Sequence, residues 1–147
     1  MPENNFESLK LEKQVCFPLY ACARETIKLY KPFLDKLNLT YTQYITMLVL
    51  WEAGSTTVKE LGNRLYLDSG TLTPLLKKLE EKGLVTRRRS TADERNLIVT
   101  ITPEGEAMKQ EAAHIPSAMA QCLTLTKEET RTLYQLLYKM LTYLEDK

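Results

Sequence analysis

The sequence has three cysteines, a single histidine and no long apolar run, and each of these features excludes a class of protein. No stretch approaches the ~18 consecutive apolar residues of a membrane-spanning helix. Residues 1–12 lack the apolar core of a signal peptide, so we expect a cytoplasmic protein. Three cysteines in a reducing compartment do not make a disulfide framework. With one histidine and no Cys-x-x-Cys pair, we expect neither a metal site nor a cofactor.

Charge of one sign is not in excess either, because the formal net charge is only +1. A uniformly basic protein that coats nucleic acid is therefore excluded, and any affinity for DNA must come from a local patch. Residues 77–95 supply such a patch, with seven Lys and Arg against four Asp and Glu. Residues 103–147 carry seven acidic side chains against five basic ones. With 147 residues, of which 44% are hydrophobic, the chain fits a single globular domain.

Periodic apolar residues predict a mainly helical chain. Spacings of three and four predict helices over Leu9–Leu37, Tyr41–Glu52, Val58–Leu65, Ser69–Lys82, Pro103 to Ala113 or past Pro116, and Lys127–Leu144. Alternation predicts antiparallel strands over Leu84–Arg89 and Asn96–Ile101, joined by a charged loop. Residues suited to the N-cap position precede four of the helices: Thr40, Thr57, Thr102 and Thr126.

Three prolines lie within these predicted helices. Pro18 and Pro32 remove backbone donors from the first helix and should kink it or mark a boundary. Pro74 lies beyond the first helical position, where proline is comfortable. It should therefore distort the first turn of its helix or delay the helix start.

The segment from Val58 to Ile101 has the order helix, tight turn, helix and hairpin, which is that of a winged helix-turn-helix. This arrangement lays its second helix in the DNA major groove and a basic hairpin beside it. The second helix carries hydroxyls and lysines that can meet bases or phosphates: Ser69, Thr71, Thr73, Lys77 and Lys78. The alternative interpretation is a helix cap followed by an ordinary solvated lysine face.

The charged loop between the two strands favours DNA binding. Asp93 is placed to orient the guanidinium of Arg95, and an oriented arginine suits a narrow minor groove. Arg87, Arg88 and Arg89 at the base of the hairpin suit phosphates. The alternative is a surface ion pair worth under about 1 kcal/mol. Taken with the helix order, these residues predict double-stranded DNA as the partner.

The elements together predict a mainly α fold with a small antiparallel β-hairpin, an α+β winged helix-turn-helix in one domain over residues 1–147. We expect residues 41–102 to bind DNA. Residues 1–40 and 103–147 carry more apolar surface than a small winged helix needs to cover. We therefore expect them to form a helical dimerisation layer, so that a homodimer meets a palindromic operator.

Two pairs of sequence segments resemble a known family. Tyr66–Glu80, taken with Asp93-Glu94-Arg95, resembles the MarR family of dimeric winged-helix regulators. Leu11–Phe17, taken with Thr40–Tyr44, is similar to the organic hydroperoxide-sensing branch of that family, the OhrR-type repressors. The resemblance extends over nearly the whole chain.

The resemblance implies that Cys16 is a peroxide-reactive thiol whose oxidation by organic hydroperoxide releases a repressor from DNA. It also implies that Tyr30 and Tyr41 hydrogen-bond near this thiol. Independently, Cys16 lies early in the first predicted helix, where the helix dipole favours a thiolate, although a lone cysteine on an apolar face is usually inert packing. Tyr30 lies about 21 Å further along one continuous helix. We therefore predict that each sensing pocket is built from both chains.

Other interpretations remain open. A MarR-type repressor could be released by a small aromatic ligand instead of an oxidant. A thiol peroxidase could turn Cys16 over catalytically, but that would leave the wing without a role, and we expect no enzymatic activity. Cys122 could trap the oxidised thiol as an intersubunit disulfide, as in some relatives. Other relatives have one reactive cysteine, which reacts with a small cellular thiol or is overoxidised. Cys22 fits packing, and we assign His114 no role.

Overall fold

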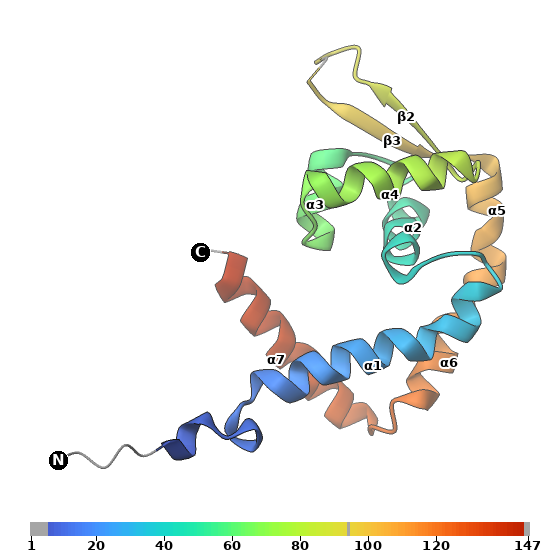
Figure 1. Cartoon of the computed structure of the whole chain (residues 1–147). Helices are drawn as coiled ribbons and strands as arrows, with labels where there is room; N and C mark the ends of the chain where they lie inside the picture. Colours follow the sequence, from blue (N-terminus) through green and yellow to red (C-terminus); the bar gives the residue numbers. More distant parts are fainter. Residues whose placement is uncertain (1–5, 94, 146–147) are drawn as a thin grey trace. The chain divides into compact units, whose positions relative to one another are not determined.

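The computed structural model describes residues 6–93 and 95–145, and the chain divides into two compact units, Met1–Ile115 and Pro116–Lys147. In the first unit, η1 (Phe6–Leu9) and η2 (Leu11–Lys13) are 3₁₀ turns. They are followed by α1 (Cys16–Asp35), α2 (Tyr41–Ala53), β1 (Ser55–Thr57), α3 (Val58–Leu65), α4 (Ser69–Glu81), β2 (Val85–Arg89), β3 (Leu97–Ile101) and α5 (Pro103–Ala112) (Figure 1). α6 (Ile115–Cys122) starts at the boundary, and α7 (Lys127–Glu145) lies in the second unit.

The fold is mainly helical with one small antiparallel sheet, which confirms the predicted fold class. The sheet has the strand order β1–β3–β2 and so contains a strand, β1, that the sequence pattern does not predict. Val99 lies at the centre of the sheet, because Thr56 of β1 pairs with it on one side and Arg87 of β2 on the other. The β2–β3 hairpin is the wing, and its base packs on α4 (Figure 1).

The core of the first unit forms where α2 meets α3, α4 and the sheet. α2 is apolar on nearly all sides, so it is buried on most of them. Its Met47 and Leu50 are fully buried, as is Leu61 of α3. A stripe of leucines on α4 and one side chain from each long strand complete the core: Leu72, Leu75, Leu76, Leu79, Val85 and Val99. This packing fixes which face of α4 remains in solvent.

Hydroxyl caps start four helices at the residues that the sequence predicts. Thr40 Oγ1 accepts from the Gln43 N–H at 3.3 Å, while Gln43 Oε1 accepts from the Thr40 N–H at 3.0 Å. This reciprocal pair satisfies two backbone donors at the start of α2. Thr57, Thr102 and Thr126 cap α3, α5 and α7 through one hydroxyl each.

The first long helix begins later than its apolar pattern suggests. Residues Phe6–Lys13 form 3₁₀ turns, and α1 starts at Cys16. Pro18 therefore lies in the first turn, where a backbone N–H has no helical partner. Pro32 lies inside α1, but the helix continues to Asp35. As a result, α1 is one uninterrupted helix from the cysteine to beyond Tyr30.

The helix α4 begins at Ser69 in spite of Pro74, so this proline does not delay the helix start, which was one of the two effects predicted for it. The physical reason is the cap that precedes it. Asp68 Oδ1 accepts from the Thr71 N–H at 2.7 Å and fixes the first turn before the proline is reached.

Large apolar side chains remain exposed on α1 and, separately, on α7. Next to α1 and along it they are Val15, Phe17, Leu19, Tyr20, Ile27 and Leu29. On α7 they are Leu133, Tyr134, Leu136, Tyr138, Met140, Tyr143 and Leu144. Within residues 6–93 and 95–145, no helix combines the length and the apolar character needed to cross a membrane. Exposed apolar surface of this extent is typical of protein–protein interfaces, the role predicted for both ends of the chain.

Candidate functional site

The side of α4 that faces away from its leucine stripe is exposed and polar. The α4 side chains that the sequence predicts to meet DNA are all exposed: Ser69, Thr71, Thr73, Lys77 and Lys78. Two hydrogen bonds at the start of α4 determine which polar groups there can still contact DNA. The Asp68–Thr71 bond holds the pKa of the Asp68 carboxyl below its usual range. Thr73 Oγ1 donates to the Ser69 carbonyl at 2.8 Å, which leaves its lone pairs and its methyl group for a base edge.

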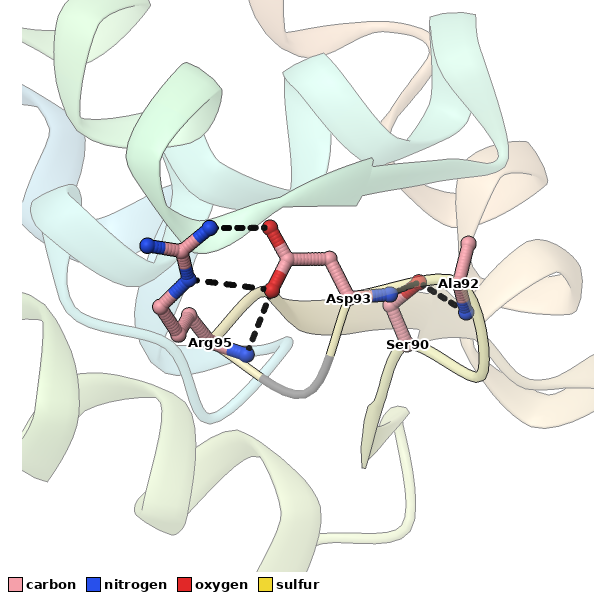
Figure 2. Close-up of polar contacts among 4 residues, drawn as sticks. All are labelled: Ser90, Ala92, Asp93 and Arg95. Atoms are coloured by element: carbon pink, nitrogen blue, oxygen red, sulfur yellow. Dashed lines mark hydrogen bonds and ion pairs between the residues drawn. The ribbon is translucent and has the colours of Figure 1, made fainter.

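The tip of the wing holds Arg95 in one orientation, as Figure 2 shows. Asp93 Oδ1 accepts from Arg95 Nε at 3.2 Å and from the Arg95 backbone N–H at 3.1 Å, and Oδ2 lies 3.5 Å from Nη2. The Ser90 hydroxyl oxygen accepts from the backbone N–H groups of Ala92 and Asp93 and so shapes the turn. The Arg95 side chain is 91% exposed. The pair therefore contributes little to stability, but it presents an oriented cation to solvent.

Arg87 at the base of the wing is engaged by the protein itself. Its Nη2 donates to Glu80 Oε1 at 3.2 Å and its backbone N–H donates to Glu80 Oε2 at 2.9 Å. Arg87 in turn lowers the pKa of the Glu80 carboxyl. The Arg87 side chain is only 20% exposed, whereas Arg88 and Arg89 are exposed. Glu80, which the sequence did not single out, thus joins the end of α4 to β2.

The two tyrosines predicted near the thiol form one cluster with a third. The ring centroids of Tyr30 and Tyr41 lie 5.0 Å apart, and Tyr44 lies 5.7 Å from Tyr30 and 6.3 Å from Tyr41. Burial raises the pKa of all three phenols, and that of Tyr44 rises to about 12. The hydroxyls therefore stay protonated at neutral pH and can donate hydrogen bonds.

Cys16 is the first residue of α1 and is exposed, as are Cys22 and Cys122. Because α1 is uninterrupted, the 14 positions between Cys16 and Tyr30 correspond to about 21 Å of rise. One chain therefore does not bring the thiol to the tyrosine cluster. Across the described residues, no group of three or more His, Cys, Asp and Glu is arranged to hold a metal ion.

The order α3, tight turn, α4 and wing, with a polar outer face on α4, defines a winged helix-turn-helix protein of the DNA-binding class. The family model of the SarA/Rot transcriptional regulators matches residues 28–112. The organic hydroperoxide resistance transcriptional regulator of Bacillus subtilis is 48% identical over 145 residues, which cover 99% of each chain. The chain belongs to this family of MarR-type winged-helix transcriptional regulators, in its organic hydroperoxide branch.

Solved structures agree with this assignment. Reduced AbfR bound to DNA matches with a TM-score of 0.78 at 36% identity, covering 94% of this chain and 96% of that one. AbfR, from Staphylococcus epidermidis, is also known in a disulfide form, which matches with a TM-score of 0.63 at 36% identity over 96% of each chain. An E. coli MarR mutant complexed with operator DNA matches with a TM-score of 0.81 at 28% identity, covering 94% of this chain and 99% of that one.

The tyrosine cluster predicts a specific alkaline dependence of stability. Between the ordinary tyrosine pKa of 10.0 and about 12, the unfolded chain loses the Tyr44 proton and the folded chain keeps it. The free energy of unfolding should therefore fall as the pH rises through this range. Tyr44→Phe should reduce this fall by roughly 1–3 kcal/mol. Urea unfolding followed by circular dichroism at neutral pH and at several alkaline values measures it.

The wild type is the reference for this comparison. Equal slopes of stability against pH for Tyr44→Phe and the wild type would contradict the burial of Tyr44.

Proposed function

We propose that the protein is a homodimeric repressor that leaves its operator when an organic hydroperoxide oxidises Cys16. One observation carries the proposal. An exposed cysteine begins the uninterrupted helix α1, which also carries Tyr30 of the tyrosine cluster, in a fold that holds another helix for a DNA groove. The relatives named above support it, because one is named for organic hydroperoxide resistance and another is known in reduced and disulfide forms.

The chemical step is a two-electron oxidation of sulfur. The Cys16 thiolate attacks one peroxide oxygen, an S–O bond forms and the O–O bond breaks. The departing alkoxide takes a proton from solvent, so the products are a sulfenic acid and an alcohol. Val15, Phe17 and Leu19 around the thiol are apolar and exposed, and they suit the organic part of such a peroxide.

The sensing pocket in this proposal is shared between two subunits. If the two α1 helices cross antiparallel near Ala23, about midway between Cys16 and Tyr30, each thiol comes to the tyrosine cluster of the other chain. The exposed apolar side chains of α1 would be buried in this crossing. A change at the thiol would then alter the spacing of the two α4 helices. Half-sites about 34 Å apart on DNA would no longer be matched.

In the reduced state, α4 would lie in the major groove and the wing beside it. Ser69, Thr71 and Thr73 would face base edges, while Lys77, Lys78, Arg88 and Arg89 would meet phosphates. Arg95, oriented by Asp93, would enter the minor groove. Arg87 would reach a phosphate only by exchanging its contact with Glu80, so its main effect would be to position β2.

Replacing Cys16 with serine tests the proposal. Both proteins, when reduced, should bind a palindromic duplex selected with the reduced wild type. Cumene hydroperoxide should release the wild type and leave Cys16→Ser bound, because the serine hydroxyl is not oxidised. A gel shift with and without the oxidant measures this. Release of Cys16→Ser from the duplex by the peroxide would rule out the redox role of this residue. Release of the untreated wild type by salicylate would favour a repressor that responds to a small aromatic ligand.

Cys22→Ser and Cys122→Ser serve as controls in the same assay. Cys22→Ser should respond like the wild type. If Cys122 resolves the oxidised thiol, an intersubunit crosslink should appear on a non-reducing gel for the wild type and be absent for Cys122→Ser.

Continued peroxide consumption with excess dithiothreitol would indicate a thiol peroxidase instead.

A mixed dimer tests whether each pocket draws on both chains. In a heterodimer of one Cys16→Ser subunit and one Tyr30→Phe subunit, a shared pocket leaves one site fully intact. A pocket within one chain leaves both sites defective. We therefore expect the heterodimer, purified with two different tags, to form sulfenic acid as fast per thiol as the wild type. Oxidation as slow as in the Tyr30→Phe homodimer would contradict a shared pocket.

The wing gives an independent prediction about DNA affinity. Arg95→Ala should weaken binding of the selected duplex by about 1–3 kcal/mol, the usual worth of a base-edge contact. Asp93→Asn keeps the cation but loosens its orientation, so it should cost less. Lys31→Ala is the control, because it removes one exposed cation from α1. Fluorescence anisotropy measures all three, and equal losses for Arg95→Ala and Lys31→Ala would rule out the minor-groove role.

A further inference from the structure

The end of α4 is tied to the turn between α1 and α2 by one lysine. Lys82 Nζ donates to the backbone carbonyl of Asn38 and, at 3.0 Å, to Gln43 Oε1. Asn38 has a positive φ of 55°, a conformation in which asparagine is among the tolerated residues. Lys82 is the C-cap residue of α4, so these two bonds join the turn to the helix that faces DNA.

Gln43 connects this lysine to the helix that carries two of the clustered tyrosines. Its side chain is almost fully buried, and Oε1 accepts from both Lys82 Nζ and the Thr40 N–H, each at 3.0 Å. The two lone pairs of this oxygen are therefore both used. Gln43 lies in the first turn of α2, between Tyr41 and Tyr44 in the chain. A rotation of this turn would displace the acceptor of the Lys82 ammonium.

The environment of the ammonium makes the tie sensitive to small displacements. Burial, and then the nearby Lys78, lower the pKa of Lys82. Lys82 as a whole residue is exposed, but its ammonium contacts a backbone carbonyl and the side-chain oxygen of the buried Gln43. A displacement of the turn would therefore disturb two charge-assisted hydrogen bonds at the end of α4.

From these contacts we infer that Lys82 is a positioning residue that couples the tyrosine cluster to α4. The chain of contacts runs from the Tyr30 ring to Tyr41 and Tyr44, then through the first turn of α2 and Gln43 to Lys82. A change at the tyrosines thereby moves the helix that faces DNA. The inference rests on the proposed function, because it requires that oxidation of the thiol displaces the tyrosines.

The test is the ratio of the dissociation constants for the selected duplex after and before cumene hydroperoxide treatment. Lys82→Met removes the ammonium and keeps the length of the side chain. We expect it to lower this ratio on the order of 2- to 30-fold, the range that residues along a coupling route produce. The rate of sulfenic acid formation at Cys16 should stay as in the wild type, because the thiol is untouched. Lys31→Met is the matched control, since it makes the same substitution at an exposed ion pair.

Two further variants separate coupling from simple structural support. Lys82→Arg keeps donors at the site and should restore much of the ratio, while Gln43→Met removes the acceptor from the other side and should lower it as Lys82→Met does. If Lys82→Met and Gln43→Met weaken binding equally in both redox states, so that the ratio matches that of Lys31→Met, the tie is only structural and the inference is overturned. A ratio of one in the wild type would instead overturn the proposed function, and the inference with it.

Discussion

The continuity of α1 determines how this protein can sense a chemical change. Because the helix runs unbroken from Cys16 past Tyr30, the thiol and the tyrosine cluster are about 21 Å apart along one axis. In the proposed function, a reaction at the thiol would therefore act on the tyrosines through a second copy of the helix. The apolar side chains that α1 exposes would then serve sensing as well as association, since the same crossing that buries them would complete the site.

The helix that faces DNA is held at both ends by side chains from elsewhere in the chain. At its start, the Asp68 carboxylate fixes the first turn. At its end, Glu80 binds Arg87 of β2 and Lys82 binds the turn that precedes α2. The leucine stripe anchors the face between them. A helix held in this way would move as a unit with the wing and with α2, as the proposed change in DNA register requires.

Much of this arrangement could be predicted from the sequence because its causes are local. The spacing of apolar residues predicts α2, α3 and α4. A threonine three residues before a backbone N–H of the first helical turn predicts each cap. The Asp93–Arg95 contact was predictable for the same reason, as its partners are two residues apart. Pro74 does not delay the start of α4 because its local penalty is outweighed by the cap at Asp68 and by the burial of the leucine stripe.

The features that the sequence did not reveal depend on partners that are distant along the chain. Strand β1 is three residues long and exists because β3 supplies its hydrogen bonds. The break between α5 and α6 was likewise not resolved by apolar spacing. Lys82 and Gln43 are 39 positions apart, and nothing in either local pattern indicates that they meet. The same holds for the tyrosines, because family resemblance named two of them but only the packing of α1 on α2 brought Tyr44 into the cluster.

These distant contacts change how the basic stretch of residues 77–95 should be understood. A count of charges treats its seven lysines and arginines as equivalent, although Lys82 and Arg87 already have protein acceptors. A cation that gives up such a partner to meet a phosphate gains little, since one charge-assisted hydrogen bond replaces another. Lys77, Lys78 and Arg88 would therefore carry more of the salt-dependent affinity than their share of the count suggests. The two bound cations would instead serve to hold α4 and the wing where the other basic residues can reach DNA.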